Sequence, residues 1–261
     1  MLIGEAQIPQ ATVIIDYDNV FPKKIEDYSK EEIETILKDI LLESLNDLSN
    51  VSDVIVRLYG GWYTSGVYTA RASILQQKLA TLNVFPIIRP AERVYIRGRI
   101  ELATSLIAIP SINWDNTVVE RNGIRQIRID HDNLTQSCTD HPAICPIKIL
   151  HKFTKSKNKV CSVSSCATVQ NTVFKESAQK MVDNMIACDY LSLCATNNAK
   201  IIIVVSDDTD HFPSYVLGSS ISASGKKIII NFTNKTYLQN WAPFFSQMNN
   251  ITIKATDYDE N

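Results

Sequence analysis

The sequence predicts a three-layer α/β/α fold, built on a parallel β-sheet and interrupted by a cysteine-containing insertion. Short β-branched apolar runs alternate with helical patterns near both ends of the 261-residue chain, which is typical of a parallel sheet covered by helices. This alternation breaks once, between about residues 91 and 175. We therefore expect one α/β domain formed by residues 1–90 and 176–261, and an inserted subdomain of strands and loops formed by residues 91–175.

The N-terminal part of the chain predicts three strands and two helices in alternation. Thr12–Ile15 is a β-branched run typical of a buried parallel strand. Lys30–Leu48 has apolar residues at helical spacing, and Ser29 followed by Glu32 predicts a capping box at its start. The remaining elements are a strand at Asp53–Gly60, a helix at Ala70–Leu82 and a strand at Val84–Ile88. This β-α-β-α-β order predicts parallel strands joined by right-handed crossovers.

The alternation resumes in the C-terminal part. Glu176–Cys194 predicts a helix, and Lys200–Val205 is the most uniformly apolar strand in the sequence. The elements that follow are a helix that starts at Phe212–Leu217, a strand at Lys227–Phe232, a helix at Leu238–Gln247 and a strand at Ile251–Ala255. The segment between the two parts shows short apolar stretches and polar turns but no pattern of a long helix, so we interpret it as the insertion.

Acidic residues gather where strands of the predicted sheet end. Asp16 follows the first strand, Asp208 and Asp210 follow Lys200–Val205, and Asp183 lies near the start of the preceding helix. Ligands of open parallel sheets bind at the carboxyl ends of the strands, so these side chains are expected to meet there. Clustered carboxylates repel one another unless a cation neutralises them, and hard oxygen ligands suit Mg²⁺ or Mn²⁺. Such ions can activate water for attack on a phosphodiester.

An aspartate at a strand end has a second interpretation, because it often only caps the next helix. For Asp18 and Asp207, taken alone, the two interpretations stay open.

Three segments resemble the motifs of NYN domains, which are PIN-like nucleases. The segments are Val13–Asn19 (VIIDYDN), Lys180–Asp183 (KMVD) with Asp189 six residues later, and Val205–Pro213 (VSDDTDHFP). Gly225 and Lys226 before an apolar strand also fit the usual ending of that family. The resemblance covers about residues 11–90 and 176–255, by the placement of these motifs on the alternating pattern.

The resemblance implies a PIN-like (Rossmann-like) domain and a Mg²⁺- or Mn²⁺-dependent endonuclease, usually acting on RNA. Carried over to this sequence, it implies that the catalytic, metal-binding acids are Asp16, Asp183, Asp208 and Asp210. It implies supporting or substrate-binding roles for Asn19, Ser206, Lys180 and Asp189. The sequence departs from the family pattern at His211, where an aromatic residue is usual, and at Asp207, where glycine is common.

The insertion carries four of the six cysteines. They are Cys138, Cys145, Cys161 and Cys166. His141 lies between the first two. Zn²⁺ takes four thiolate or imidazole ligands in a tetrahedron, and a small segment with little core often needs such a staple. We therefore predict a structural zinc site formed by the four cysteines, with His141 as an alternative ligand. The other interpretation is that all four are free thiols.

The composition limits the partners. Hydrophobic residues make up 45% of the chain and charged residues 21%, which is typical of a soluble globular protein. Because the net charge is only -2, a nucleic acid would have to bind a local basic surface. One acid-free stretch in the insertion contains Lys148, Lys152, Lys155, Lys157 and Lys159. These lysines either contact phosphates or are simply solvated.

The chain contains no apolar run of the roughly 18 residues needed to cross a bilayer. Its N-terminus also lacks the pattern of a secretory signal. We expect a cytoplasmic protein with reduced cysteines and no membrane partner.

Two other functions remain open at this point. Asp16 and Asp18 after an apolar strand match the nucleophile and acid/base pair of haloacid dehalogenase-like phosphatases. Alternatively, the chain is a non-catalytic RNA-binding module that recognises RNA through its insertion. A phosphatase needs Asp18 and forms an aspartyl-phosphate on Asp16. A binding module has no need to crowd carboxylates beside a polyanion.

Overall fold

The computed structural model divides the chain into two compact units. The larger unit is formed by Met1–Thr117 and Lys180–Asn261, and the smaller unit by Val118–Gln179. The structure describes residues 10–48, 51–89, 94–123, 129–130, 132–155, 159–161, 163 and 165–256. The smaller unit is thus shorter than the expected insertion, because the residues from 94 to 117 belong to the larger unit.

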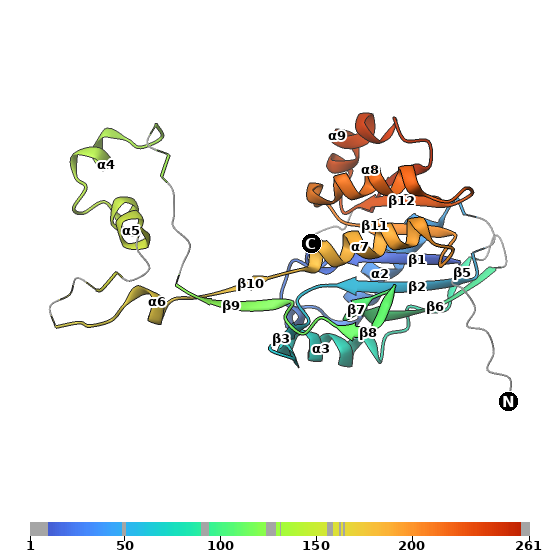
Figure 1. Ribbon diagram of the computed structural model, residues 1–261, viewed down its shortest axis with the longest axis horizontal. Coiled ribbons are helices and arrows are strands. Elements are labelled where there is room, and N and C mark those ends of the chain that lie inside the picture. Colours follow the sequence, from blue (N-terminus) through green and yellow to red (C-terminus); the bar gives the residue numbers. More distant parts are fainter. Residues whose placement is uncertain are drawn as a thin grey trace. The chain divides into compact units, whose positions relative to one another are not determined.

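The larger unit contains a mostly parallel central sheet (Figure 1). Within the described residues its seven strands have the order β13-β12-β11-β1-β2-β6-β5. Their bounds are β1 Ala11–Asp16, β2 Asp53–Tyr59, β5 Ile87–Arg89, β6 Val94–Leu102, β11 Ile201–Val205, β12 Lys227–Phe232 and β13 Ile251–Ala255. Neighbouring strands are parallel except for β5, which pairs antiparallel with β6. Every residue of β1 is buried, as expected for a central strand covered on both faces.

Helices cover both faces of the sheet, which confirms the α/β/α layering. Successive residues of a strand point to opposite faces, and β1 follows this rule. The helices are α2 Lys30–Leu45, α3 Ala70–Leu79, α7 Val182–Ala195, α8 Phe212–Ile221 and α9 Lys235–Phe245. Val13 and Ile15 pack in one core with α2 and α3, whereas Ile14 packs in the other core with α7, α8 and α9.

The expected capping box at the start of α2 is confirmed. The backbone N–H of Glu32 donates to Ser29 Oγ at 3.1 Å, and the backbone N–H of Ser29 donates to the Glu32 carboxylate at 2.5 Å. The helix ends at Leu45, three residues before the expected end. Short elements complete this part of the unit: α1 Tyr17–Val20, η1 Ile25–Asp27, β3 Tyr63–Thr64, β4 Val67–Tyr68, β7 Ser105–Leu106 and β8 Ile109–Asn113.

The third parallel strand was expected in the wrong place. Residues 84–88 do not form it, and β5 begins only at Ile87 and runs antiparallel. The parallel neighbour of β2 is β6, which lies in the segment expected to be the insertion. The reason is that β6 carries Arg97, Arg99 and Glu101 within its apolar residues, so it lacks the pattern of a buried strand.

The helix expected at Glu176–Cys194 begins six residues later. Lys175–Gln179 forms β10 instead, because it pairs antiparallel with β9 (Val118–Asn122). Met181 then adopts a left-handed conformation (φ 66°), and α7 starts at Val182.

In its described residues the smaller unit combines the β9–β10 pair with three short helices. These are α4 Gln136–Asp140, α5 Pro146–Thr154 and α6 Gln170–Val173. Across the described ranges of the chain, no helix is both long and apolar enough to cross a membrane.

Candidate metal centre

The first and third sequence motifs meet at the carboxyl ends of β1 and β11. These strands are adjacent and parallel, with Ile15 opposite Val205, so Asp16 and Ser206 leave the sheet side by side. Ser206 Oγ donates to Asp16 Oδ2 at 3.2 Å, and Asn19 Nδ2 donates to the same oxygen at 2.7 Å. Asp16 is 4% exposed, so these two donors hold a nearly buried carboxylate in one orientation.

Backbone hydrogen bonds fix the turn that follows β11. The backbone N–H of Asp207 donates to Asn19 Oδ1 at 2.8 Å, and that of Asp208 donates to Ser206 Oγ at 3.1 Å. The Asp208 carboxylate caps the turn η2 (Thr209–His211) by accepting from the Asp210 backbone N–H at 2.8 Å.

Asp207 faces away from this cluster. Its carboxylate accepts hydrogen bonds from the backbone N–H of Thr233, at 2.8 Å, and from the Thr233 hydroxyl. Asp207 therefore ties the end of β11 to the residue after β12, which is a structural role. Asp18 is also engaged elsewhere, since its carboxylate lies 2.6 Å from Arg71 Nη1.

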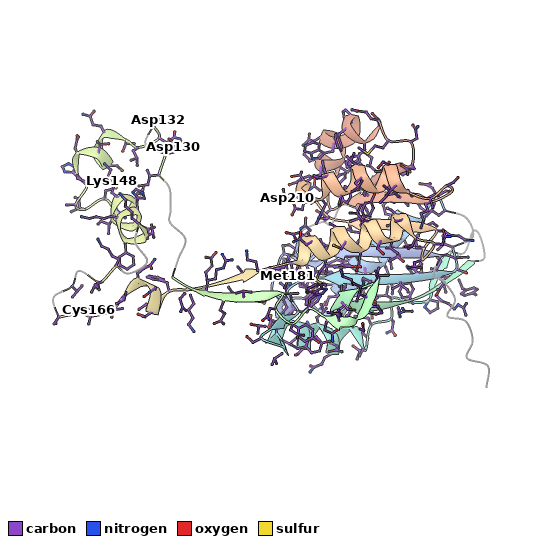
Figure 2. All side chains as sticks on the ribbon, in the orientation of Figure 1. Asp130, Asp132, Lys148, Cys166, Met181 and Asp210 are labelled. Carbon is purple, nitrogen blue, oxygen red and sulfur yellow. The ribbon has the colours of Figure 1, made fainter. Side chains whose placement is uncertain are left out.

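The first turn of α7 brings Asp183 to the same place. Asp183 is exposed at the surface of the unit. Partial desolvation of its carboxyl group raises its pKa, His211 opposes the rise, and the nearby charges of Asp16, Asp208 and Asp210 add to it. One carboxylate oxygen of Asp183, one of Asp208 and one ring nitrogen of His211 all lie within 4.8 Å of one another. Figure 2 shows Met181, which precedes α7, and Asp210 at the same end of the larger unit. Three separate segments thus converge on one potential metal site.

His211 is the member of this group that sequence reasoning did not assign to the site. It is 1% exposed, and its Nε2 atom lies 4.0 Å from Asp16 Oδ2. That nitrogen has no hydrogen-bond partner among the residues that the structure describes. The only signal in the sequence was the departure from the family motif at this position.

Asn19, Ser206 and Asp210 lie at the acidic cluster, whereas Lys180 lies just before α7. Asn19 and Ser206 contact Asp16 directly, and Asp210 is exposed on η2 with its charge acting on Asp183. The backbone N–H of Lys180 donates to the Thr117 carbonyl oxygen at 2.8 Å, just before α7.

Asp189 does not join the acidic cluster. It is fully buried and accepts from Arg57 Nη1 at 2.5 Å, the Tyr59 hydroxyl at 2.5 Å and the Ile107 backbone N–H at 2.7 Å. Six residues along an α-helix correspond to about 240° of rotation, so Asp183 and Asp189 lie on different sides of α7. The expectation of a supporting role at the metal site is therefore corrected to that of a buried partner for Arg57.

The four cysteines of the smaller unit form two pairs rather than one tetrahedral group. The thiols of Cys138 and Cys145 interact, and so do those of Cys161 and Cys166. Hydrogen bonds to the Lys148 backbone N–H lower the pKa of Cys145, and hydrogen bonds to Thr168 lower the pKa of Cys166.

Within the described residues, neither cysteine pair has a third His, Cys or carboxylate at ligand distance, and His141 joins neither pair. The arrangement gives no support to the expected four-cysteine zinc site.

Comparison with models of known protein families gives no match, and comparison with curated proteins gives none either.

Proposed function

We propose that the larger unit is a metal-dependent nuclease, in which Asp16, Asp183 and Asp208 hold a divalent cation and Asp210 adds negative charge beside it. The observation that carries this proposal is the convergence of Asp183, Asp208 and His211 within 4.8 Å of one another, next to Asp16. Mg²⁺ and Mn²⁺ are the cations that suit a site of this kind. RNA is the substrate class implied by the resemblance of the three motifs to NYN domains, and the reaction would be hydrolysis of a phosphodiester bond.

The donor set fits a cation. Carboxylates packed this closely repel one another, and the nearby acids add to the rise in the pKa of Asp183 that desolvation causes. A bound divalent ion would supply a water activated for attack and positive charge for the phosphate oxygens.

The protein's own residues would keep these ligands in place. Asn19 and Ser206 hold the Asp16 carboxylate, and the Ser206 hydroxyl also fixes the backbone before Asp208. Ligands oriented in this way need little rearrangement when the ion binds.

The decisive test is cleavage of labelled single-stranded RNA and single-stranded DNA by the purified full-length protein, with Mg²⁺, Mn²⁺ or EDTA. We expect cutting of RNA that requires a divalent ion. Asp208→Asn should reduce the cleavage rate by at least about 100-fold, because outer-shell substitutions alone cost about 10–100-fold and Asp208 would be a direct ligand.

Asp18→Asn is the matched control. Asp18 lies two residues after Asp16 but pairs with Arg71, so its loss should leave the nuclease rate nearly unchanged. A phosphatase of the haloacid dehalogenase type would lose its activity with the same substitution. Trapping a phospho-adduct on Asp16 would overturn the nuclease proposal, and so would tight RNA binding by a folded protein that neither binds metal nor cuts.

A further inference from the structure

His211 is a buried imidazole with one unsatisfied nitrogen. It is 1% exposed, and Nε2 has no hydrogen-bond partner within the described part of the chain. Buried polar atoms in proteins are nearly always paired, because an unpaired one loses its hydration without compensation. This nitrogen therefore needs a partner that the described protein atoms do not supply.

Carboxylate oxygens lie close to the ring nitrogens of His211. Nε2 is 4.0 Å from Asp16 Oδ2, which is too long for a hydrogen bond. A ring nitrogen of His211 is also within 4.8 Å of carboxylate oxygens of Asp183 and Asp208. If two ligand atoms each lie about 2.1–2.2 Å from the same ion, they are about 3.0 Å apart when the two ion–ligand bonds are at right angles. They are about 4.4 Å apart when the two bonds point in opposite directions. The 4.0 Å separation from Asp16 Oδ2 falls between these two values, and the upper limit of 4.8 Å for the other atoms is close to the larger one.

The imidazole is held in this position by the elements around it. His211 is the last residue of η2, which the Asp208 carboxylate caps, and its carbonyl oxygen accepts from Ser214 Oγ at 2.6 Å. The next residue, Phe212, packs against Trp241 with the ring centroids 4.7 Å apart. The ring of His211 lies 6.1 Å from that of Tyr215 on α8. A side chain whose neighbours on both sides in the sequence are held in place can serve as a preformed ligand.

A purely structural role explains these observations less well. A histidine that only fills the core would pair its ring nitrogens with protein groups. A protonated histidine that only balances the acids would donate to Asp16 at hydrogen-bond distance, about 2.7–3.2 Å. Neither interpretation accounts for a buried nitrogen at 4.0 Å from a carboxylate.

We propose that Nε2 of His211 is a direct ligand of the metal ion, together with Asp16, Asp183 and Asp208, and that the site therefore selects Mn²⁺ over Mg²⁺. Mg²⁺ prefers oxygen ligands and keeps several of its waters, whereas imidazole favours divalent transition-metal ions. This inference rests on the same acidic cluster as the proposed nuclease and assigns its metal preference to one residue.

The test measures metal binding, independently of catalysis. Free Mn²⁺ is followed by electron paramagnetic resonance as the metal is added to the full-length protein, and Mg²⁺ is added as a competitor. Wild type should bind Mn²⁺ at least about tenfold more tightly than Mg²⁺. His211→Gln should lower Mn²⁺ affinity by at least about tenfold and change Mg²⁺ affinity by less than about threefold, because Mg²⁺ depends on the carboxylates.

A spectroscopic measurement on the wild type keeps the test decisive if the variant fails to fold. Pulsed electron paramagnetic resonance of the Mn²⁺-loaded protein should detect a directly bound nitrogen, and labelling histidine with ¹⁵N should change that signal. His151→Gln, at the last turn of α5 in the smaller unit, is the control and should keep both the affinity and the nitrogen signal. The proposal is overturned if the wild type shows no nitrogen signal, or if folded His211→Gln keeps the wild-type preference for Mn²⁺.

These outcomes separate the two proposals. A nitrogen-bound Mn²⁺ in a protein that cuts neither RNA nor DNA would support the role of His211 and overturn the nuclease. Metal-dependent cutting with equal affinities for Mg²⁺ and Mn²⁺ and no nitrogen signal would support the nuclease and overturn the role of His211.

Discussion

In the larger unit apolar side chains are buried on both faces of the sheet, whereas in the described part of the smaller unit many of them lie at the surface. Val13 and Ile14 on β1 are fully buried, on opposite faces. In the smaller unit Ile144 is 75% exposed and Ile147 is 50% exposed. Burial of apolar area drives folding, so the larger unit has its own core, whereas the described residues of the smaller unit form little core.

The same contrast holds for polar interactions. The larger unit contains a buried ion pair between Arg57 and Asp189, with the two side chains 6% and 0% exposed. The ion pair between Lys175 and Glu120 in the smaller unit is 66% and 67% exposed. Pairs of opposite charge therefore contribute very differently to stability in the two units, according to whether water reaches them.

The largest effect is expected from breaking the buried ion pair. Asp189→Ala removes the fully buried partner of the Arg57 guanidinium, which keeps only the partly exposed carboxylate of Glu101, 2.9 Å from its Nε. The substitution should lower the free energy of unfolding by about 3 kcal/mol, the lower end for breaking a buried ion pair. The measurement is urea unfolding followed by tryptophan fluorescence. All three tryptophans, Trp62, Trp114 and Trp241, belong to the larger unit.

Glu120→Ala is the matched control in the smaller unit. It removes an exposed ion pair, and circular dichroism should detect no change in unfolding. Equal losses for the two variants would contradict the contrast between buried and exposed charges.

A second comparison uses one residue type in both units. Ile186 on α7 is fully buried, whereas Ile149 on α5 is 49% exposed. Ile186→Ala should cost about 2–5 kcal/mol because it removes apolar contacts and leaves a cavity. Ile149→Ala should stay within about 0.5 kcal/mol, as surface substitutions do. Urea unfolding of both variants, followed by circular dichroism, tests this, and a large loss for Ile149→Ala would show that this face of α5 is covered in solution.

The smallest effect concerns helix caps. Ser29 caps α2 with its side chain, whereas the structure shows no side-chain cap at Thr135, the N-cap residue of α4. Ser29→Ala should cost about 1 kcal/mol and Thr135→Ala should cost less. Thermal unfolding of both variants checks the difference, and the reverse order would indicate that Thr135 caps α4 in solution.

The capping box also predicts a dependence on pH. The Ser29 backbone N–H, and then the Ser29 hydroxyl, lower the pKa of Glu32 below its ordinary value of 4.5. A carboxyl group with a lowered pKa stabilises the fold above its ordinary pKa, and this stabilisation is lost as the pH falls through the lowered value. Glu32→Ala should therefore destabilise the protein at neutral pH, and the difference from wild type should disappear in strong acid.

The elements that could be predicted from the sequence are those whose surroundings are uniform. The strand Lys227–Phe232 was predicted with its observed bounds because its centre is an unbroken run of isoleucines, Ile228–Ile230. Strand β6 was missed because it carries charged side chains at alternate positions. The first residues assigned to α7 form β10 instead, because pairing with β9 decides their conformation, and a local pattern does not contain that partner.

The candidate site was predictable to the extent that it follows from topology. Asp16 and Asp208 come together because they end adjacent parallel strands. His211 was missed because a single histidine at the start of a helix carries no signal of its burial. Asp189 was assigned to the wrong place, although Arg57 within an apolar strand was a sign that a buried acid is needed to pair with it.

The side-chain amide of Asn19 connects the end of β1 to the turn after β11 through two different atoms. Its Nδ2 donates to Asp16 while its Oδ1 accepts from the backbone of Asp207, and among the short side chains only an amide offers both a donor and an acceptor at these two ends. An aspartate in its place would add another negative charge and lose the donor. A full set of acids in a related chain is thus an incomplete signature of the candidate site, because one uncharged residue holds Asp16 and the turn after β11 in their relative positions.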